Sequence, residues 1–425
     1  MLQVSYIRDN REQVLERLAV KNFKQPQLVD EIIQLDEKRR QVQSMLDALK
    51  ASDNLVSKRI GEFMREGKKA EADNLKTSEA NQGLKEDIKR NSEFLSATED
   101  ELQQKIVLLP NLPHSSVPLG TTPEENEVVL ENGAKPNLPT DALPHWELAT
   151  KYNLIDFELG VKITGAGFPV YKGKGAKLQR ALIAYFLDEA EKAGYSEVML
   201  PLLVNEASGF GTGQLPDKEG QMYFVGQDNL YLIPTAEVPI TNLYRDVILK
   251  ADELPVKNCG YTPCFRREAG SYGAHVRGLN RLHQFDKVEI VQVVHPDTSY
   301  EVLEGMSAHV QSLLQNLGLP YRVLRLCGGD MSFTAALTYD METWSAAQQR
   351  WLEVSSVSNF ETFQSNRLKL RFRNSEGKTQ LAHTLNGSAL ALPRIVATLL
   401  ENNQTERGIK IPEVLVPYTK FEWIN

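Results

Sequence analysis

The sequence predicts an α+β protein with two dissimilar parts: an N-terminal antiparallel two-helix coiled-coil arm, and a larger domain with a central antiparallel sheet flanked by helices. Between Gln27 and Leu109 there is no proline, and core-type positions recur with heptad spacing, which is typical of long paired helices. After His145, short apolar runs follow one another along the chain, which favours antiparallel strands over a doubly wound parallel sheet.

The composition sets limits on the function. The chain has 425 residues, 41% hydrophobic and 24% charged, which allows two or three domains with a large core. Its net charge of −8 means that any nucleic-acid contact needs a local basic patch. No apolar run approaches the roughly 18 residues of a membrane span, and the first nine residues contain no apolar signal core. We therefore expect a cytoplasmic protein with no membrane partner.

The three cysteines, Cys259, Cys264 and Cys327, are odd in number and have no ligand-like spacing. This pattern predicts neither a disulfide framework nor a zinc site.

The arm is expected at about residues 27–108, after one or two short helices in residues 1–25. Its core-type positions, here called the seam, alternate steps of four and three in both helices, and Glu66-Gly67-Lys68-Lys69 predicts the reversal between them. The seam positions are Leu28, Ile32, Leu35, Arg39, Val42, Leu46, Leu49, Asp53, Val56, Ile60 and Phe63, then Leu84, Ile88, Asn91, Leu95, Thr98 and Leu102. A helix of about 40 residues is about 60 Å long, too long to be buried in the main body, so the arm is expected to reach into solvent.

Two interpretations of the arm stay open. Heptads usually form a dimerisation coiled coil, but the glycine break favours folding back within one chain. From Lys38 to Arg90 there are 13 Lys or Arg against 9 Asp or Glu, in a chain that is otherwise acidic. The outer arm is thus its basic end, which is typical of RNA contact and also of a solvated helix face. The basic residues are Lys58, Arg59, Arg65, Lys68, Lys69 and Lys76.

Residues 109–144 are proline-rich and predict a linker, and the mixed domain follows at 145–425. Within it the sequence predicts helices at 177–193, near 300–316 and at 389–402. It predicts strands at 198–204, 222–225, 230–233, 262–267, 284–293, 321–326 and 350–357. There is no GxxxxGK[ST] loop and no strand–GxGxxG–helix unit, so a phosphate site must be of another kind.

One segment of this domain suggests a nucleotide site. Arg266 and Glu268 are two residues apart and share one face of a predicted strand, and Phe285 returns on the next strand. A guanidinium on phosphate, a carboxylate near an exocyclic amine and a ring against the base together grip a nucleotide. Taken alone, the Arg-x-Glu pattern is more often an exposed ion pair than a nucleotide site.

Several segments resemble one family. Residues 194–201, 265–285 and 386–394 resemble the three signatures of class II aminoacyl-tRNA synthetases. Residues 212–216 and 235–239 resemble the amino-acid site of seryl-tRNA synthetases, and the N-terminal hairpin resembles the arm of that family. The resemblance covers essentially the whole chain and keeps the order of its parts.

This resemblance implies a homodimeric, ATP-dependent, AMP-forming ligase. It would activate L-serine with ATP to seryl-adenylate and pyrophosphate, then transfer serine to the 3′ end of its tRNA, with selenocysteine tRNA as a further candidate acceptor. Activation is an in-line displacement that relies on positioning and cationic stabilisation. The implied domains are a tRNA-binding domain at 1–108, the linker at 109–144 and an aminoacylation domain at 145–425.

The resemblance also assigns site residues. Arg266 and Arg394 are the expected catalytic cations, and Phe285 and Arg394 would enclose the adenine from opposite sides. ATP binding is assigned to Arg266, Arg267, Glu268, Phe285, Glu353, Val354, Ser355, Ser356 and Arg394. Serine binding is assigned to Thr235, Ala236, Glu237, Glu289 and Ser388. Mg²⁺ is assigned to Glu353 and Ser356, which offer the oxygen ligands it prefers.

The sequence departs from the family pattern at two places. Pro393 stands where a small residue usually precedes the arginine, which puts the local helix start in question. Ala274-His275 stand where an Arg-Asp pair is expected, which affects contacts with the tRNA acceptor end.

Alternative interpretations also stay open. Glu289 could be a simple ion-pair partner of Lys287, and the strand around Glu353 could be an ordinary polar face. A ligase that loads a carrier protein would have no use for the arm. A non-catalytic RNA-binding scaffold would be expected to have lost Arg266, Glu268, Glu353 or Arg394, and all four are present.

Overall fold

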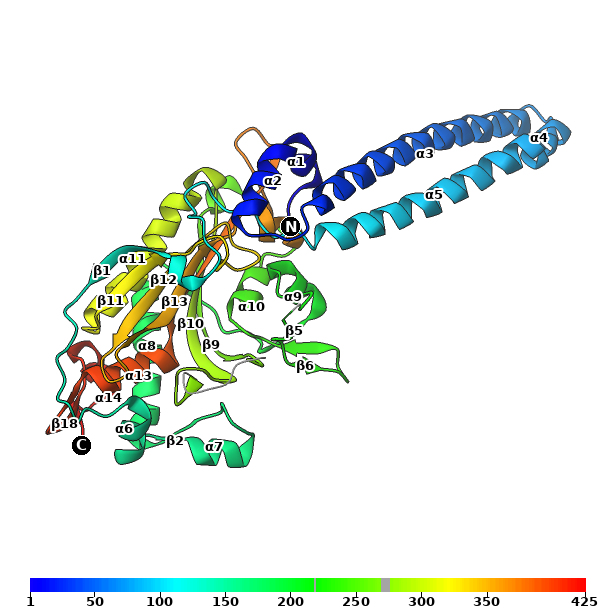
Figure 1. Cartoon of the computed structure of the whole chain (residues 1–425). Helices are drawn as coiled ribbons and strands as arrows, with labels where there is room; N and C mark the ends of the chain where they lie inside the picture. Colours follow the sequence, from blue (N-terminus) through cyan, green and yellow to red (C-terminus); the bar gives the residue numbers. More distant parts are fainter. Residues whose placement is uncertain (218, 269–275) are drawn as a thin grey trace. The chain divides into compact units, whose positions relative to one another are not determined.

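The computed structural model describes residues 1–217, 219–268 and 276–425 (Figure 1). These residues form two compact units. Unit 1 comprises residues 1–19 and 23–110, and unit 2 comprises residues 20–22 and 111–425. Helices and a large, mostly antiparallel sheet confirm the predicted α+β class. Among the described helices, none has both the length and the apolar character that crossing a membrane requires.

Unit 1 is entirely helical. Its helices are α1 (Val4–Asp9), α2 (Arg11–Val20), α3 (Gln27–Arg65), α4 (Lys69–Thr77) and α5 (Glu79–Ile106). Helices α3 and α5 lie side by side and antiparallel, which confirms the two-helix arm (Figure 1). Every seam position is buried or half-buried, so the heptads are satisfied within one chain.

The tip of the hairpin differs from the prediction. The chain turns at Gly67, whose φ of 75° is readily available only to glycine, but the return helix does not start there. Helix α4 intervenes and buries Ala72, and α5 begins after Ser78. The Ser78 hydroxyl oxygen accepts a hydrogen bond from the Asn81 amide at 3.3 Å and caps α5. The reversal therefore takes a helix of nine residues rather than a single turn.

Unit 2 is organised around an eight-stranded sheet with the order β1-β11-β12-β13-β16-β10-β9-β4. Neighbouring strands are antiparallel, except that the edge strand β4 runs parallel to β9. The strands are β1 (Glu127–Asn132), β4 (Ser196–Glu197), β9 (Val256–Phe265), β10 (Gln284–Val294), β11 (Tyr321–Arg325), β12 (Leu337–Ser345), β13 (Arg350–Asn359) and β16 (His383–Ala391).

Three long helices pack against this sheet: α8 (Gly173–Lys192), α11 (Ser299–Asn316) and α13 (Leu392–Asn402). The shorter helices are α6 (His145–Lys151), α7 (Phe157–Ile163), α9 (Glu206–Thr212), α10 (Glu237–Asn242), α12 (Thr362–Leu368) and α14 (Val416–Thr419). One large apolar core joins the sheet with α8, α11 and α13.

Four small sheets complete unit 2. Their strands are β2 (Ile155–Asp156) and β3 (Val170–Tyr171); β5 (Leu203–Asn205), β6 (Phe224–Val225) and β7 (Leu230–Leu232); β8 (Ile248–Lys250), β14 (Arg371–Arg373) and β15 (Thr379–Leu381); and β17 (Gln404–Thr405), β18 (Gly408–Lys410) and β19 (Trp423–Ile424).

Several predicted elements are wrong in their extent, and the strand expected at 262–267, for example, is β9, which already begins at Val256. Only residues 203–204 of the strand expected at 198–204 are in a strand, β5. Residues 198–202 lie between β4 and β5 and include Pro201, which has no amide hydrogen to donate. The helix expected at 389–402 begins at Leu392, because residues 389–391 belong to strand β16. That strand contains Asn386 and Gly387, residue types that are depleted in strands, which explains why propensity did not reveal it.

Candidate active site

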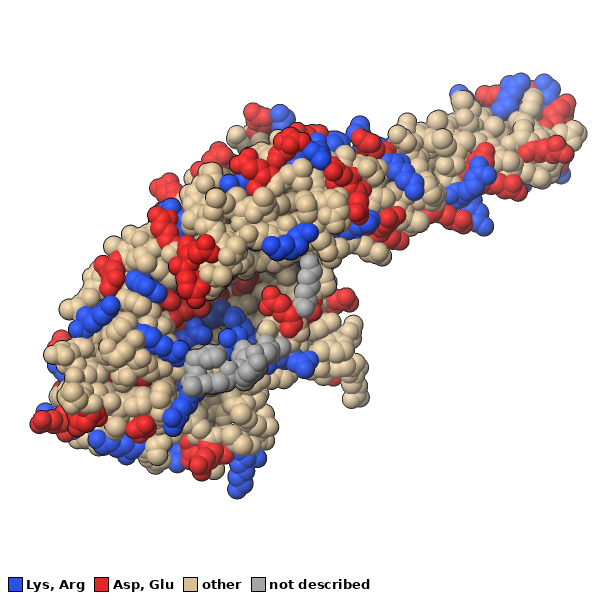
Figure 2. All heavy atoms as spheres, viewed as in Figure 1, with Lys and Arg blue, Asp and Glu red and all other residues tan. Residues whose placement is uncertain are grey.

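A cavity of about 550 Å³ lies in unit 2, lined from β10, β13, β16, the starts of α10 and α13, and the segment that follows β9. Figure 2 shows a hollow on this face of the unit, with Lys and Arg side chains inside it. The cavity brings together every assigned site residue except Arg267 and Ala236. The assigned residues in its lining are Thr235, Glu237, Arg266, Glu268, Phe285, Glu289, Glu353, Val354, Ser355, Ser356, Ser388 and Arg394.

The two exceptions have local causes. Arg267 is exposed, and its backbone N–H donates to the Gln221 carbonyl at 2.9 Å. Because side chains alternate along extended chain, Arg266 faces the cavity and Arg267 does not. Ala236 is fully buried directly before α10.

One end of the cavity has an aromatic floor. The Arg266 guanidinium lies over the Phe285 ring, 5.3 Å from its centroid, and Arg266 Nε donates to the Pro234 carbonyl at 3.2 Å. The pairing of β9 with β10 continues past their ends, since the Arg266 N–H donates to the His283 carbonyl at 2.9 Å. Nearby, the Glu268 carboxylate forms an ion pair with Arg281, and Glu268 has a positive φ of 48°.

Arg394 reaches the cavity from the first turn of α13. Its Nε donates to the Asn280 carbonyl at 3.0 Å, and its NH1 donates to the Glu353 carbonyl at 2.7 Å. Pro393 does not disturb this helix, because it lies in the first turn, where a missing amide hydrogen costs no helical bond. The other departure, Ala274-His275, lies outside the described residues.

At the other end of the cavity, three buried polar residues meet at the hydroxyl of Thr235: Thr235 itself, Lys287 and Glu289. Lys287 Nζ donates to the Thr235 hydroxyl at 2.8 Å and lies 2.5 Å from Glu289 Oε2. The Thr235 hydroxyl donates to Glu289 Oε2 at 3.3 Å. The side chains of Lys287 and Glu289 are only 7% and 2% exposed. The ion pair considered as an alternative for Glu289 is therefore present, and it lies inside the cavity.

Glu237 lies beside this cluster with a perturbed pKa. Its Oε1 accepts a hydrogen bond from Gln364 Nε2 at 2.6 Å, and Gln364 Oε1 accepts one from the Thr384 hydroxyl at 2.8 Å. Burial, reinforced by the negative charge of Glu289, raises the pKa of Glu237 to about 7 despite the hydrogen bond from Gln364. The carboxylate thus lacks the full set of partners that a buried charge requires.

Strand β13 adds an acidic group to the wall, and β12 lies beside it in the sheet. The Ser356 hydroxyl donates to Glu353 Oε1 at 3.4 Å, and Ser356 is paired across the sheet with Asp340. Burial and the nearby Glu353 carboxylate raise the pKa of Asp340 well above its ordinary value. Asp340 Oδ1 is buried and has no hydrogen-bond partner within residues 1–217, 219–268 and 276–425.

The sequence reasoning assigned no site role to Lys287, Gln364, Asn280 or Arg281. Lys287 carried a usable signal, because it alternates with Phe285 and Glu289 on one strand and must share their face. Gln364 had no local signal, since it comes from α12 and meets Glu237 only in the folded chain.

Comparison with known proteins first gives the class. Residues 223–403 match the family described as tRNA synthetase class II core domain (G, H, P, S and T). Residues 1–113 match the family described as seryl-tRNA synthetase N-terminal domain. A serine–tRNA ligase of Salinibacter ruber is 52% identical to the chain, covering 100% of it and 99% of the relative. A serine–tRNA ligase of Methylacidiphilum infernorum is 46% identical over 100% of both chains.

Solved structures agree with these matches. The seryl-tRNA synthetase of Pyrococcus horikoshii, complexed with ATP, has a TM-score of 0.92 and 31% identity, covering 100% of this chain and 99% of that one. The cytoplasmic serine–tRNA ligase of Naegleria fowleri, in complex with AMP, has a TM-score of 0.86 and 27% identity, with the same coverage. The chain belongs to the seryl-tRNA synthetase family of enzymes, as the sequence resemblance implied.

Proposed function

We propose that this chain activates L-serine with ATP to form seryl-adenylate, then transfers the serine to the 3′ end of its tRNA. The single observation that carries this proposal is the composition of the 550 Å³ cavity. Its lining offers an aromatic ring with an arginine over it, a second arginine and buried carboxylates. This arrangement fits a nucleotide beside a small ammonium-bearing, hydroxylated substrate.

In the activation step, a serine carboxylate oxygen attacks the α-phosphorus of ATP. The bond from that phosphorus to the bridging oxygen breaks, and pyrophosphate leaves. Arg266 is proposed to hold the α-phosphate and Arg394 to lie against the adenine opposite Phe285. Their fixed positive charges would stabilise the negative charge that grows on the phosphoryl oxygens. In the transfer step, a hydroxyl of the terminal tRNA ribose attacks the seryl carbonyl and AMP leaves.

The serine end of the cavity is proposed to select by charge and hydroxyl. Glu237 and Glu289 would receive the substrate ammonium and hydroxyl, with Thr235 and Ser388 completing the polar surroundings. A site built for a hydroxyl rejects alanine strongly, because its buried polar groups would stay unpaired, whereas rejection of threonine depends on pocket size. The raised pKa of Glu237 supports this role, because the ammonium would supply the missing partner.

Mg²⁺ is the implied metal of this reaction, and Glu353 and Ser356 are proposed to hold it. They offer hard oxygen donors side by side, and the buried, unpartnered Asp340 Oδ1 lies on the paired strand. The described residues contain no group of three or more His, Cys, Asp or Glu that could hold a metal. Mg²⁺ normally needs only one or two protein carboxylates beside substrate phosphates. When bound, it would neutralise phosphate charge.

The hairpin of α3 and α5 is proposed to bind the tRNA. The seam is used within the chain, so the helices need no partner coiled coil. Figure 2 shows charged side chains of both signs interspersed on the visible face of the hairpin, and the basic surplus of its sequence favours phosphate contacts. A carrier-protein ligase would leave this hairpin without a use. Selenocysteine tRNA stays a candidate second acceptor, and the cytoplasm stays the predicted compartment.

A homodimer is proposed through the edge of the large sheet. Strand β4 ends that sheet, and Met199, two residues after its last residue, is 95% exposed. An unpaired strand edge next to an exposed apolar side chain is a typical association surface.

The test is serine-dependent exchange of labelled pyrophosphate into ATP, followed by tRNA charging. We expect exchange with serine and little with alanine, threonine or glycine. Replacing Lys68 and Lys69 by Glu should leave exchange intact and weaken charging of serine tRNA, while selenocysteine tRNA is tested in the same assay. Exchange with another amino acid and none with serine would contradict the substrate. Exchange without charging of any tRNA would contradict the acceptor.

A further inference from the structure

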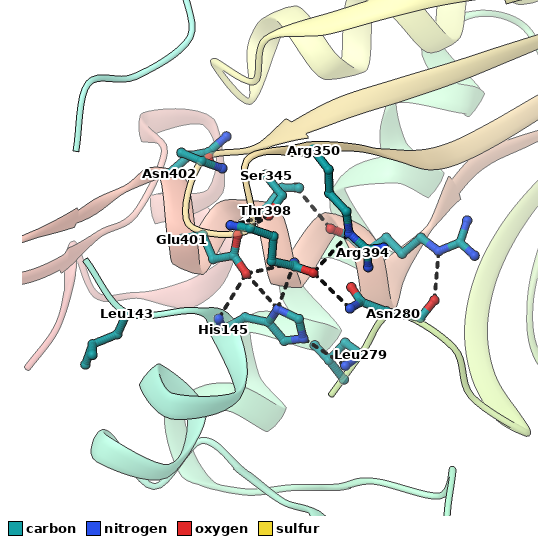
Figure 3. Close-up of polar contacts among 12 residues, drawn as sticks. Leu143, His145, Leu279, Asn280, Ser345, Arg350, Arg394, Thr398, Glu401 and Asn402 are labelled. Atoms are coloured by element: carbon teal, nitrogen blue, oxygen red, sulfur yellow. Dashed lines mark hydrogen bonds and ion pairs between the residues drawn. The ribbon is translucent and has the colours of Figure 1, made fainter. Parts of the chain in front are cut away.

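A further buried carboxylate, Glu401 on α13, lies outside the cavity and pairs with His145 at the start of α6. Both side chains are 0% exposed, and His145 Nδ1 lies 2.7 Å from Glu401 Oε1 (Figure 3). On its other side, His145 Nε2 lies 2.9 Å from the backbone nitrogen of Leu279. Nothing in the proposed reaction uses this pair directly, yet it occupies a costly place in the core.

The Leu279 contact fixes the tautomer of the ring. A backbone N–H can only donate, so His145 Nε2 must accept. The proton of the neutral ring therefore sits on Nδ1 and is donated to Glu401. The carboxylate also accepts from the His145 N–H at 3.0 Å, from Gln348 Nε2 at 3.0 Å and from the Ser345 hydroxyl. Burial opposes ionisation, but these hydrogen bonds outweigh it and lower the pKa of Glu401.

The segment held by His145 forms one edge of the proposed ATP site. Leu279, Asn280, Arg281 and Leu282 all line the cavity. The Asn280 carbonyl accepts the 3.0 Å hydrogen bond from Arg394 Nε, and Arg281 pairs with Glu268. Figure 3 shows His145 facing Leu279, with Asn280 between this contact and Arg394. The hydrogen bond at Leu279 therefore lies one residue before Asn280, which holds Arg394, and two residues before Arg281, which pairs with Glu268.

Two further contacts tie the segment to the pair. Gln348, which donates to Glu401, accepts from Asn280 Nδ2 at 2.9 Å through its Oε1. Gly278 has a φ of 69°, and a Cβ there would lie 2.3 Å from His145 Nε2. Only glycine lets the segment lie this close to the imidazole.

We propose that His145 and Glu401 are positioning residues for ATP: the pair holds residues 278–281 in place, and through Asn280 and Arg281 it sets the positions of Arg394 and Glu268. Serine binding does not depend on it, because the serine end of the cavity is built from Thr235, Glu237, Lys287 and Glu289. This inference rests on the proposed function.

The experiment compares His145→Asn with His145→Gln in the serine-dependent exchange assay. An Asn amide is placed to keep the Nδ1-like donor to Glu401 but leaves the Leu279 N–H without an acceptor, whereas the longer Gln can present an oxygen near the Nε2 position. We expect Asn to raise the KM for ATP about tenfold, as the loss of one buried hydrogen bond implies, and Gln to raise it less. The KM for serine should change less than twofold in both.

Two further variants separate positioning from general stability. Gly278→Ala pushes the segment away from an intact His145–Glu401 pair, and it should also raise the KM for ATP selectively. Thr398→Val is the matched control, because Thr398 lies buried on the same helix and bonds only to carbonyls of that helix in the described contacts. It should lower the melting temperature without moving the KM for ATP.

The outcomes are distinct. An unchanged KM for ATP in His145→Asn and Gly278→Ala, or an equal rise in both KM values, would overturn the positioning role. An equal rise in Thr398→Val would overturn it too. If the unmodified chain shows no serine-dependent exchange, the proposed function itself fails, and that result is read before any variant is compared.

Discussion

Two buried glutamates on neighbouring parts of unit 2 have opposite surroundings. Glu401 accepts hydrogen bonds from His145, Ser345 and Gln348, and its pKa is lowered. Glu237 accepts one from Gln364 in the described part of the chain, faces Glu289, and has a pKa raised to about 7. The fold supplies the Glu401 carboxylate with several hydrogen-bond donors and supplies the Glu237 carboxylate with only one in the described residues. A buried charge that the protein does not satisfy marks the place where a ligand does so.

The largest effect is expected from deleting the Glu401 carboxylate, which accepts several buried hydrogen bonds. Glu401→Ala leaves the donors of His145, Ser345 and Gln348 buried without an acceptor, which should destabilise unit 2 by about 3–5 kcal/mol. Thermal unfolding measures this as a clear drop in melting temperature. Glu401→Gln, which keeps one acceptor, should cost less, and equal losses in the two variants would contradict the view that the donors need an acceptor.

Replacing Glu237 should instead affect serine binding and not stability. Glu237→Gln should raise the KM for serine about 100-fold, since a charge-assisted bond to the ammonium is worth about 2–3 kcal/mol. Stability should not fall. Because the folded pKa of about 7 lies above the ordinary value of 4.5 for a glutamate, the group contributes stability below pH 4.5 that is lost as pH rises through 7.

Glu237→Gln has no ionisable group at position 237, so it does not lose this stability as pH rises. Its melting temperature relative to the unmodified chain should therefore rise between pH 4.5 and pH 8. A variant that is less stable at pH 8 than at pH 5, relative to the unmodified chain, would reverse the assignment of the shift to Glu237.

The pH dependence of serine use should report the same group. The kcat/KM for serine should fall about tenfold per pH unit below about pH 7, because only ionised Glu237 pairs with the ammonium. At saturating serine, the kcat/KM for ATP should lack this limb. An unchanged limb in Glu237→Gln would assign it to another residue.

The smallest effect comes from the two glutamines, one beside each carboxylate. Gln364→Leu removes the donor to Glu237 and should move the serine limb upward by about one pH unit. Gln348→Leu should leave that limb in place, because Gln348 contacts Glu401 instead. Equal shifts in the two variants would remove the distinction between the sites.

The arm and four strands of the large sheet, β9, β10, β11 and β13, could be predicted from the sequence, because heptad spacing and alternation act over neighbouring residues, whereas β1, β4 and β12 were not predicted. Every seam position proved buried or half-buried. Helix α4 was missed because Gly67 offered a simpler reversal, and β16 was missed because Asn386 and Gly387 oppose strand formation locally. Only the neighbouring strands β10 and β13 hold that segment extended.

The candidate site followed from residues that lie near one another in sequence or match a family signature. Lys287 was within reach of strand alternation. Gln364 and His145 were not, because each acts through contacts with segments more than 100 residues away. Such supporting residues have ordinary local contexts, and only the folded chain shows what they hold.

The burial along the hairpin of α3 and α5 sets how fast its backbone amides exchange with solvent. Leu28, Ile32 and Leu35 are buried near the base of α3, whereas Val56 and Ile60 are only half-buried farther out. Apolar contacts that thin out along a helix pair let its far end open and close without the rest. Backbone amides near the tip should thus exchange with deuterated solvent much faster than those near the base, because the tip opens locally while the base stays closed.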